Sequence, residues 1–147
     1  IFGDIFLDDL RKYREDILTE IGFEGVFPLW KIPTKDLIQE FIRLGFKTIV
    51  VCVNERFLDQ SFVGRIIDKS FINDLPKNVD VCGENGEFHT FTFDGPIFSK
   101  SIDFEIGEVV YRKYERPEKE DSSDTASDTS ASDAFDFGFW YCDLVSI

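Results

Sequence analysis

A continuous apolar run from Thr48 to Val53 restricts the fold of this chain more than any other segment. Its residues are mostly β-branched and carry no charge, which is typical of a strand buried on both faces. The preceding segment has apolar residues at helical spacing and ends at Gly45; these residues are Leu37, Ile38, Phe41, Ile42 and Leu44. A helix that leads directly into a buried strand predicts the α/β class.

Similar patterns predict the remaining helices and strands. An amphipathic helix is expected from Leu7 to Ile21, where Asp8 is placed to cap the start and Gly22 to end it. Thr34 is placed to cap the helix before the buried strand. Short helices are expected between 54 and 77, separated near Gly64 or Asp68. Strands are expected at 26–30, 88–93, 109–114 and 137–145, with Gly107 as the turn before the third.

The overall charge and the cysteines exclude several classes of protein. The 147 residues carry a formal net charge of −13, which argues against binding to nucleic acid or to an anionic membrane. No apolar run approaches the roughly 20 residues of a membrane span. Cys52, Cys82 and Cys142 lie far apart and form no CxxC pair, so neither a disulfide framework nor a zinc site is supported. A reducing, cytoplasmic location is expected.

An acidic segment at 117–136 differs from the rest of the chain. It holds seven acidic residues, one lysine, five serines and two threonines. Such a segment cannot form a core, so a solvated loop or insert is expected. Phosphorylation of serines beside acidic residues could recruit a basic partner. The alternative is a passive linker that tolerates insertion.

The segment from Cys82 to Thr90 contains two glutamates, an asparagine, two glycines and the single histidine of the chain. A glycine turn that leads into a strand can direct the side chains of Glu84, Glu87 and His89 into one pocket for a polar substrate. General acid–base chemistry would then fall to His89 with Glu84 or Glu87. The alternative is an ordinary hairpin turn whose side chains face water. A metal site here would need a further ligand from elsewhere, and no metal is predicted.

Gly3 and Asp4 form a second candidate site. They follow an apolar pair that would end a strand, which is where open α/β sheets place ligand-binding loops. Asp4 could contact a nucleotide or magnesium, or it could cap the following segment. The sequence contains no GxxxxGK[ST], GxGxxG, GxSxG or HExxH motif. The start on Ile1 and the absence of methionine predict a piece of a longer polypeptide.

Five blocks in this order resemble the diphthine-ammonia ligase family of PP-loop ATP pyrophosphatases: Phe2-Gly3-Asp4-Ile5, Pro28-Leu29-Trp30, Gly64-Arg65, Cys82 to Phe91 and Asp94 to Phe98. The resemblance implies that residues 1–33 are the end of a Rossmann-like ATP-binding domain. It implies that residues 34–147 are a smaller α/β substrate-binding domain, with 117–136 as an insert. The family's Ser-Gly-Gly-Lys-Asp-Ser phosphate loop is absent from these residues, so this chain alone is expected to be inactive.

The resemblance implies an ATP-dependent, amide-forming ligase. ATP with Mg²⁺ would activate a carboxylate by adenylation, and ammonia would then displace AMP. The carboxylate would be that of diphthine on elongation factor 2, or an unknown carboxylate in a bacterial relative. The matched positions are Gly3 and Asp4 for the nucleotide, Arg65, Glu84, Asn85, Gly86 and Thr90 for the substrate, Glu87 and His89 for catalysis on ammonia, and Gly64 in the motif with Arg65.

Two other functions remain open at the level of sequence. The first is a non-catalytic binding module that keeps the substrate fold and docks partners through the acidic insert. The second is a structural domain that forms a homo-oligomer, which exposed phenylalanine surface would favour.

Overall fold

The computed structural model describes residues 1–113 and 137–147. The predicted insert at 117–136 therefore lies outside the described residues. The helices are α1 (Asp8–Glu20), α2 (Thr34–Arg43), the short 3₁₀ helix η1 (Gln60–Phe62) and α3 (Lys69–Asp74). The strands are β1 (Lys47–Asn54), β2 (Phe88–Asp94), β3 (Phe104–Lys113) and β4 (Gly138–Ser146).

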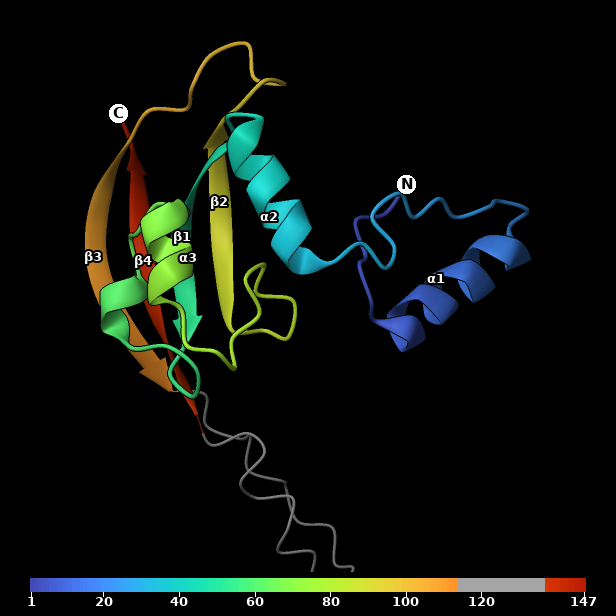
Figure 1. Cartoon of the computed structure of the whole chain (residues 1–147), viewed down its shortest axis with the longest axis horizontal. Coiled ribbons are helices and arrows are strands. Elements are labelled where there is room, and N and C mark those ends of the chain that lie inside the picture. The colour runs from blue at the N-terminus through green and yellow to red at the C-terminus, as the bar shows by residue number, and fades with distance from the viewer. Residues whose placement is uncertain (114–136) are drawn as a thin grey trace, which may run out of the picture.

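The strands form one antiparallel sheet in the order β2-β1-β4-β3. Figure 1 shows α2 and α3 beside this sheet. One buried cluster joins both helices to it and contains Ile38 of α2, Phe71 of α3, Val53 of β1 and Phe88 of β2. The predicted mixed α/β class is therefore confirmed, with all the strand pairs of the sheet antiparallel.

The central strand β1 is buried as the sequence predicted. Val50 and Val53 are 0% exposed, and Ile49 is 1% exposed. β2 pairs with β1 on one side, but β4 pairs with it only at 52–54. The rest of that side is taken by the segment at 64–67, because Gly64 donates to the carbonyl of Val50 at 2.8 Å and Val50 donates to the carbonyl of Arg65 at 2.9 Å.

The outer strands β3 and β4 pair along most of their length, and the pairing continues to Lys113 opposite Gly138. β3 begins at Phe104, earlier than predicted. Gly107 consequently lies inside this strand, at an irregularity in the pairing between Ile106 and Val109, rather than in a turn before it. This part of the prediction was wrong because a bulge residue has the composition of a turn residue.

The predicted strand at 26–30 is absent, because residues 28–31 form a turn. Pro28 has no N–H to donate to a ladder, and the aromatic side chains around it pack locally instead. The rings of Phe27 and Phe2 are stacked at 5.4 Å. The guanidinium of Arg11 lies 4.7 Å from the ring of Phe27 and 4.6 Å from that of Trp30.

Helix α1 ends as predicted but starts differently. Its N-cap is Leu7, so Asp8 is the first helical residue and not the cap. At the other end Gly22 has φ of 76°. The N–H groups of Gly22 and Phe23 then bond to the carbonyls of Thr19 and Leu18 at 3.1 and 2.8 Å, a closure that favours glycine at this position.

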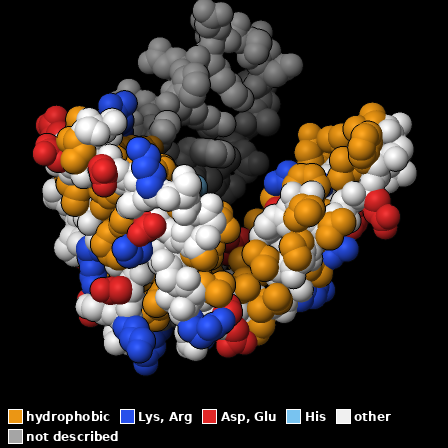
Figure 2. Space-filling view, turned by 90° about the horizontal axis from the view of Figure 1, so that it is seen from above, with side chains coloured by type: hydrophobic (Ala, Val, Ile, Leu, Met, Phe, Trp, Pro, Cys, Tyr) orange, Lys and Arg blue, Asp and Glu red, His pale blue; other side chains and the backbone are white. Residues whose placement is uncertain are grey.

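Helix α1 has no buried residue, and Figure 1 shows it apart from the sheet. The exposed large apolar side chains of residues 1–33 are Ile1, Phe6, Leu7, Tyr13, Ile17, Ile21, Phe23 and Val26. Figure 2 shows hydrophobic side chains gathered over this part of the molecule, at the right of the view. In the described part of the chain, no helix has the length and apolar character needed to cross a membrane.

Candidate functional site

A cavity of about 410 Å³ lies where the N-terminal segment, α2 and the sheet meet. Its walls include the apolar side chains of Ile5, Leu29, Leu37, Ile38 and Phe41. Three of the residues predicted for the site, Gly3, Glu84 and Thr90, also line it. The fold thus brings a candidate nucleotide residue and two candidate substrate residues to one cavity.

His89 lies away from this cavity. It lines a second cavity of about 670 Å³ together with Cys52, Tyr141 and Cys142. Successive residues of a strand face opposite sides of a sheet, so His89 and its neighbour Thr90 are directed to different faces. The structure therefore does not place His89 in the same pocket as Glu84.

Glu87 is almost fully enclosed, with 1% of its surface exposed. Its Oε1 accepts the backbone N–H of Asp80 at 2.9 Å and the side-chain amide of Asn85 at 3.0 Å. Its Oε2 accepts the backbone N–H of Asn85 at 2.8 Å. Both oxygens are thus bonded to groups of the glycine turn, which identifies Glu87 and Asn85 as residues that hold the turn.

Asp80 organises the same turn, and sequence reasoning missed it. Its Oδ1 accepts the backbone N–H groups of Cys82 at 2.9 Å and Glu84 at 3.4 Å. Its Oδ2 accepts the hydroxyl of Thr34 at 2.6 Å. An aspartate two residues before a turn amide is a recognisable signal for this kind of turn. The N-cap of α2 is Pro33, so the predicted capping role of Thr34 was wrong: it ties α2 to the turn.

The two turn glycines adopt the left-handed backbone conformation, with φ of 74° at Gly83 and 80° at Gly86. A Cβ at Gly83 would lie 2.9 Å from the carbonyl oxygen of Phe88. The carbonyl of Gly86 accepts the side-chain amide of Asn54 at 3.5 Å. The positive φ at both positions, together with the lack of room for a Cβ at Gly83, favours glycine at 83 and 86.

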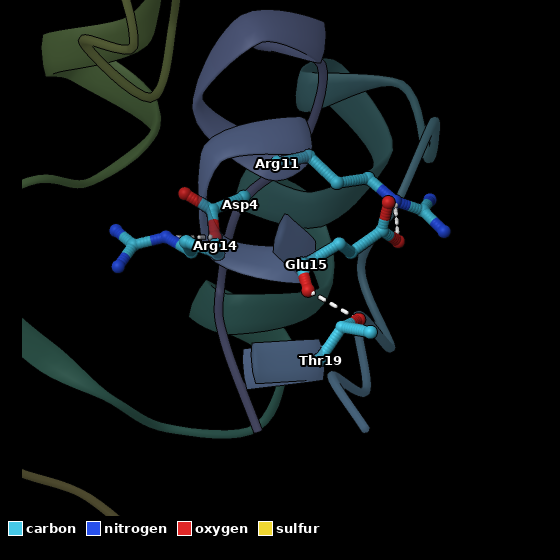
Figure 3. Close-up of polar contacts among 5 residues, drawn as sticks. All are labelled: Asp4, Arg11, Arg14, Glu15 and Thr19. Atoms are coloured by element: carbon cyan, nitrogen blue, oxygen red, sulfur yellow. Dashed lines mark hydrogen bonds and ion pairs between the residues drawn. The ribbon is translucent and has the colours of Figure 1, made fainter. Parts of the chain in front are cut away.

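Asp4 is held against helix α1. Its Oδ2 lies 2.9 Å from Nε of Arg14, and its side chain is 9% exposed. The N–H is poorly aligned with this oxygen, so the contact is an ion pair without a well-formed hydrogen bond. Figure 3 shows these two side chains facing each other, while Arg11 pairs with Glu15 elsewhere on the helix. Because Leu7 is the N-cap and makes no side-chain cap bond, the capping alternative for Asp4 was wrong.

Burial and neighbouring carboxylates determine the protonation of the cavity residues. Burial raises the pKa of Glu84, and the charges of Asp80, Asp4 and Glu87 raise it further. Burial, followed by the charges of Asp80 and Glu84, raises the pKa of Cys82 to about 12. The Cys82 thiol donates to the carbonyl of Thr34 at 3.4 Å. Cys82 is thus held as a thiol, which disfavours a nucleophilic role.

Arg65 does not line the 410 Å³ cavity. Its Nη2 forms an ion pair with Oδ2 of Asp74 at 2.7 Å, and its guanidinium lies 5.3 Å from the ring of Phe62 and 5.4 Å from that of Phe71. Its neighbour Gly64 has φ of 78° beside β1. Within residues 1–113 and 137–147, no three His, Cys, Asp or Glu side chains are grouped so that they could hold a metal ion.

Known proteins match most of this chain. The sequence model of the diphthamide synthase C-terminal domain family matches residues 33–118. The diphthine–ammonia ligase of Bos taurus is 34% identical over 113 residues, covering 74% of this chain and 42% of that protein. The Homo sapiens protein of the same name is 32% identical with the same coverage.

A more distant relative is the diphthine–ammonia ligase of Schizosaccharomyces pombe, which is 27% identical over 123 residues, covering 76% of this chain and 20% of that protein. The chain therefore spans less than half the length of these curated relatives. Since the family model matches more than half of its residues, this chain belongs to the diphthamide synthase C-terminal domain family.

Proposed function

We propose that this chain is the substrate-binding part of an ATP-dependent ligase that converts diphthine and ammonia into the amide diphthamide. The overall reaction would consume a carboxylate, ammonia and ATP, and would release the amide, AMP and pyrophosphate. The observation that carries this proposal is the meeting of Gly3, Glu84 and Thr90 at one cavity. The names of the relatives supply the reaction class.

The division into domains is part of this proposal. Residues 1–33 would be the end of a Rossmann-like ATP-binding domain, and residues 34–147 the substrate-binding domain. The match of the family model from residue 33 onward supports this boundary. The absence of buried residues in α1 also supports it, because the apolar side chains of that helix would be covered by the rest of the ATP-binding domain.

The residues around the cavity do not fit the phosphates of a nucleoside triphosphate such as ATP. Neither lysine nor arginine is among the described residues that line it, and phosphate oxygens need cationic or N–H donors. The carboxylate of Asp4 already pairs with Arg14. We therefore propose that residues outside this cavity bind the ATP phosphates. Gly3 and Asp4 would lie at the border of the cavity without binding those phosphates.

Substrate binding is assigned to Glu84 and Thr90, with Asn85 and Gly86 shaping the turn that presents Glu84. Arg65, which pairs with Asp74, would contact substrate only outside the cavity. Of the proposed catalytic residues, Glu87 would act through the turn that it holds. His89 would act only on a ligand that reaches the opposite face of the sheet.

The test uses the full-length ligase, with elongation factor 2 bearing diphthine as substrate and with amide formation and pyrophosphate release both measured. Glu84→Gln should raise the KM for the protein substrate roughly tenfold with a smaller change in kcat, as expected when uniform binding is lost. His89→Ala serves as the comparison on the opposite face. Unchanged kinetics for Glu84→Gln together with a large loss of kcat for His89→Ala would place the site on the other face and reject this assignment.

A further inference from the structure

Two walls of the cavity come from separate elements of the chain. Helix α2 supplies apolar side chains, among them Leu37, Ile38 and Phe41, and the glycine turn supplies Glu84. The separation of these two walls decides whether a bound group can contact both at once. Residues that fix this separation therefore influence binding without contacting the ligand.

Thr34 joins the two walls, because it is the first residue of α2 and is bonded to the turn in two ways. Its hydroxyl donates to Oδ2 of Asp80 at 2.6 Å, and its carbonyl accepts the Cys82 thiol at 3.4 Å. Within the described residues, no other hydrogen bond runs between α2 and the segment at 80–90. The hydrogen-bonded link between the walls thus depends on one threonine.

Thr34 lies on the side of α2 that lines the cavity. Residues three and four positions apart share one face of a helix, so Thr34 stands one turn before Leu37 and Ile38. Phe41 continues the same face. A bond at Thr34 therefore fixes the distance of this apolar face from the turn.

Asp80 extends the link to Glu84. Its Oδ1 accepts the backbone N–H groups of Cys82 at 2.9 Å and Glu84 at 3.4 Å, while its Oδ2 accepts the Thr34 hydroxyl. One carboxylate thus bonds the start of α2 with one oxygen and the backbone of the turn with the other. Hydrogen bonds to an ionised acceptor are stronger than those between neutral groups, which suits a contact that has to hold a distance.

We propose that Thr34 and Asp80 are positioning residues for substrate binding, because together they hold Glu84 at a set distance from the apolar face of α2. This inference rests on the proposed function, in which Glu84 contacts the substrate. Neither Thr34 nor Asp80 is among the described residues that line the cavity, so both act through Glu84. The hydroxyl of Thr34 is the group that matters for this role.

The test measures the kinetics of the full-length ligase with elongation factor 2 bearing diphthine, at saturating ATP and ammonia. Thr34→Val removes the hydroxyl and keeps the shape of the side chain. It should raise the KM for the protein substrate roughly fivefold and leave kcat within about twofold of the parent value, as expected when uniform binding weakens. Thr34→Ser keeps the hydroxyl and should match the parent enzyme in both constants.

Thr19→Val is the matched control. The Thr19 hydroxyl donates to the carbonyl of Glu15 at 2.7 Å within α1, so its loss should leave the KM unchanged. Thr34→Val combined with Asp80→Asn should raise the KM by less than the product of the two separate effects, because both residues act through one bond. If thermal unfolding shows that Thr34→Val is not folded, Thr34→Ala takes its place.

Hydrogen exchange of the full-length protein supplies a readout that needs no catalysis. Mass spectrometry of a peptide covering residues 80–86 should show roughly fivefold faster exchange in Thr34→Val and unchanged exchange in Thr34→Ser. An unchanged KM in Thr34→Val, or an equal rise in Thr34→Ser, would overturn the proposal. Fully multiplicative effects of Thr34→Val and Asp80→Asn would also overturn it, since independent sites behave in that way.

The two readouts distinguish the failure of this inference from that of the proposed function. Faster exchange in Thr34→Val, with no amide formation by the parent enzyme, would reject the ligase and leave Thr34 as the residue that holds the turn. Amide formation by the parent enzyme, with equal KM and equal exchange in Thr34→Val, would reject the positioning role and leave the ligase.

Discussion

The carboxylate of Glu87 accepts the backbone N–H of Asp80 at 2.9 Å, and in this way it closes the turn that carries Glu84. Asp80 in turn accepts the N–H of Glu84 and the hydroxyl of Thr34. These two carboxylates therefore set the position of a third one, which lines the cavity.

Glu87→Gln is expected to destabilise the fold by about 1–3 kcal/mol, because an amide N–H₂ would replace one of two acceptors that face N–H donors. Urea unfolding at neutral pH measures this change. Glu105→Gln on the exposed side of β3 is the matched control and should stay within about 0.5 kcal/mol of the parent chain. Equal stability of the two variants would show that the buried carboxylate does not hold the turn.

Gly83→Ala and Gly86→Ala separate backbone strain from steric clash. Both positions have positive φ, so each alanine should cost about 1–2 kcal/mol. At Gly83 the added Cβ would also meet the Phe88 carbonyl oxygen at 2.9 Å, whereas at Gly86 no heavy atom lies within 4 Å. Thermal unfolding should therefore show a larger loss for Gly83→Ala, and the reverse order would contradict the turn geometry.

Glu84→Gln should stabilise the chain at neutral pH. The raised pKa of Glu84 means that the folded state keeps its proton above 4.5, the ordinary value, where the unfolded chain loses it. Stability therefore falls as the pH rises through this window, and glutamine removes the penalty. The gain should be under about 1 kcal/mol, since solvent screens this partly exposed group.

Urea unfolding of Glu84→Gln and the parent chain at two pH values tests this dependence. The difference in the free energy of unfolding between the variant and the parent chain should be present at neutral pH and should vanish well below pH 4.5. A constant difference across this range would mean that the charge of Glu84 is not responsible.

Cys82 should react slowly with alkylating reagents. Because its pKa is raised to about 12, the folded chain presents very little thiolate at neutral pH, and alkylation should be about a hundredfold slower than in concentrated urea. Mass spectrometry after timed exposure to iodoacetamide measures both rates. Rapid modification of Cys82 in the folded chain would show that the thiol is not enclosed as described.

The sequence predicted the parts of the fold that depend on local pattern. The uncharged run at 48–53 specified β1, and the helical spacing before it specified α2. The segment at 26–30 was mistaken for a strand, because apolar composition alone does not reveal that Phe27 and Trp30 pack against each other and against the guanidinium of Arg11.

The sequence predicted which residues belong to the candidate site better than it predicted how their side chains are arranged. The glycine turn indicated Glu84, but the pairing of Glu87 with backbone N–H groups depends on how the turn closes. The direction of His89 depends on strand register, where a shift of one residue reverses the face. Asp80 was missed because its three donors come from two separate segments.

The pairing of Lys113 with Gly138 joins the two ends of the connection between β3 and β4. The carboxylate of Glu55 adds to this by accepting the N–H of Gly138 at 2.6 Å and the hydroxyl of Tyr111 at 2.9 Å. Closing a connection costs only about 0.6 kcal/mol more for each doubling of its length. Homologous chains can therefore gain or lose many residues at this point and still assemble the same sheet, so the length of the connection can evolve almost independently of the cavity.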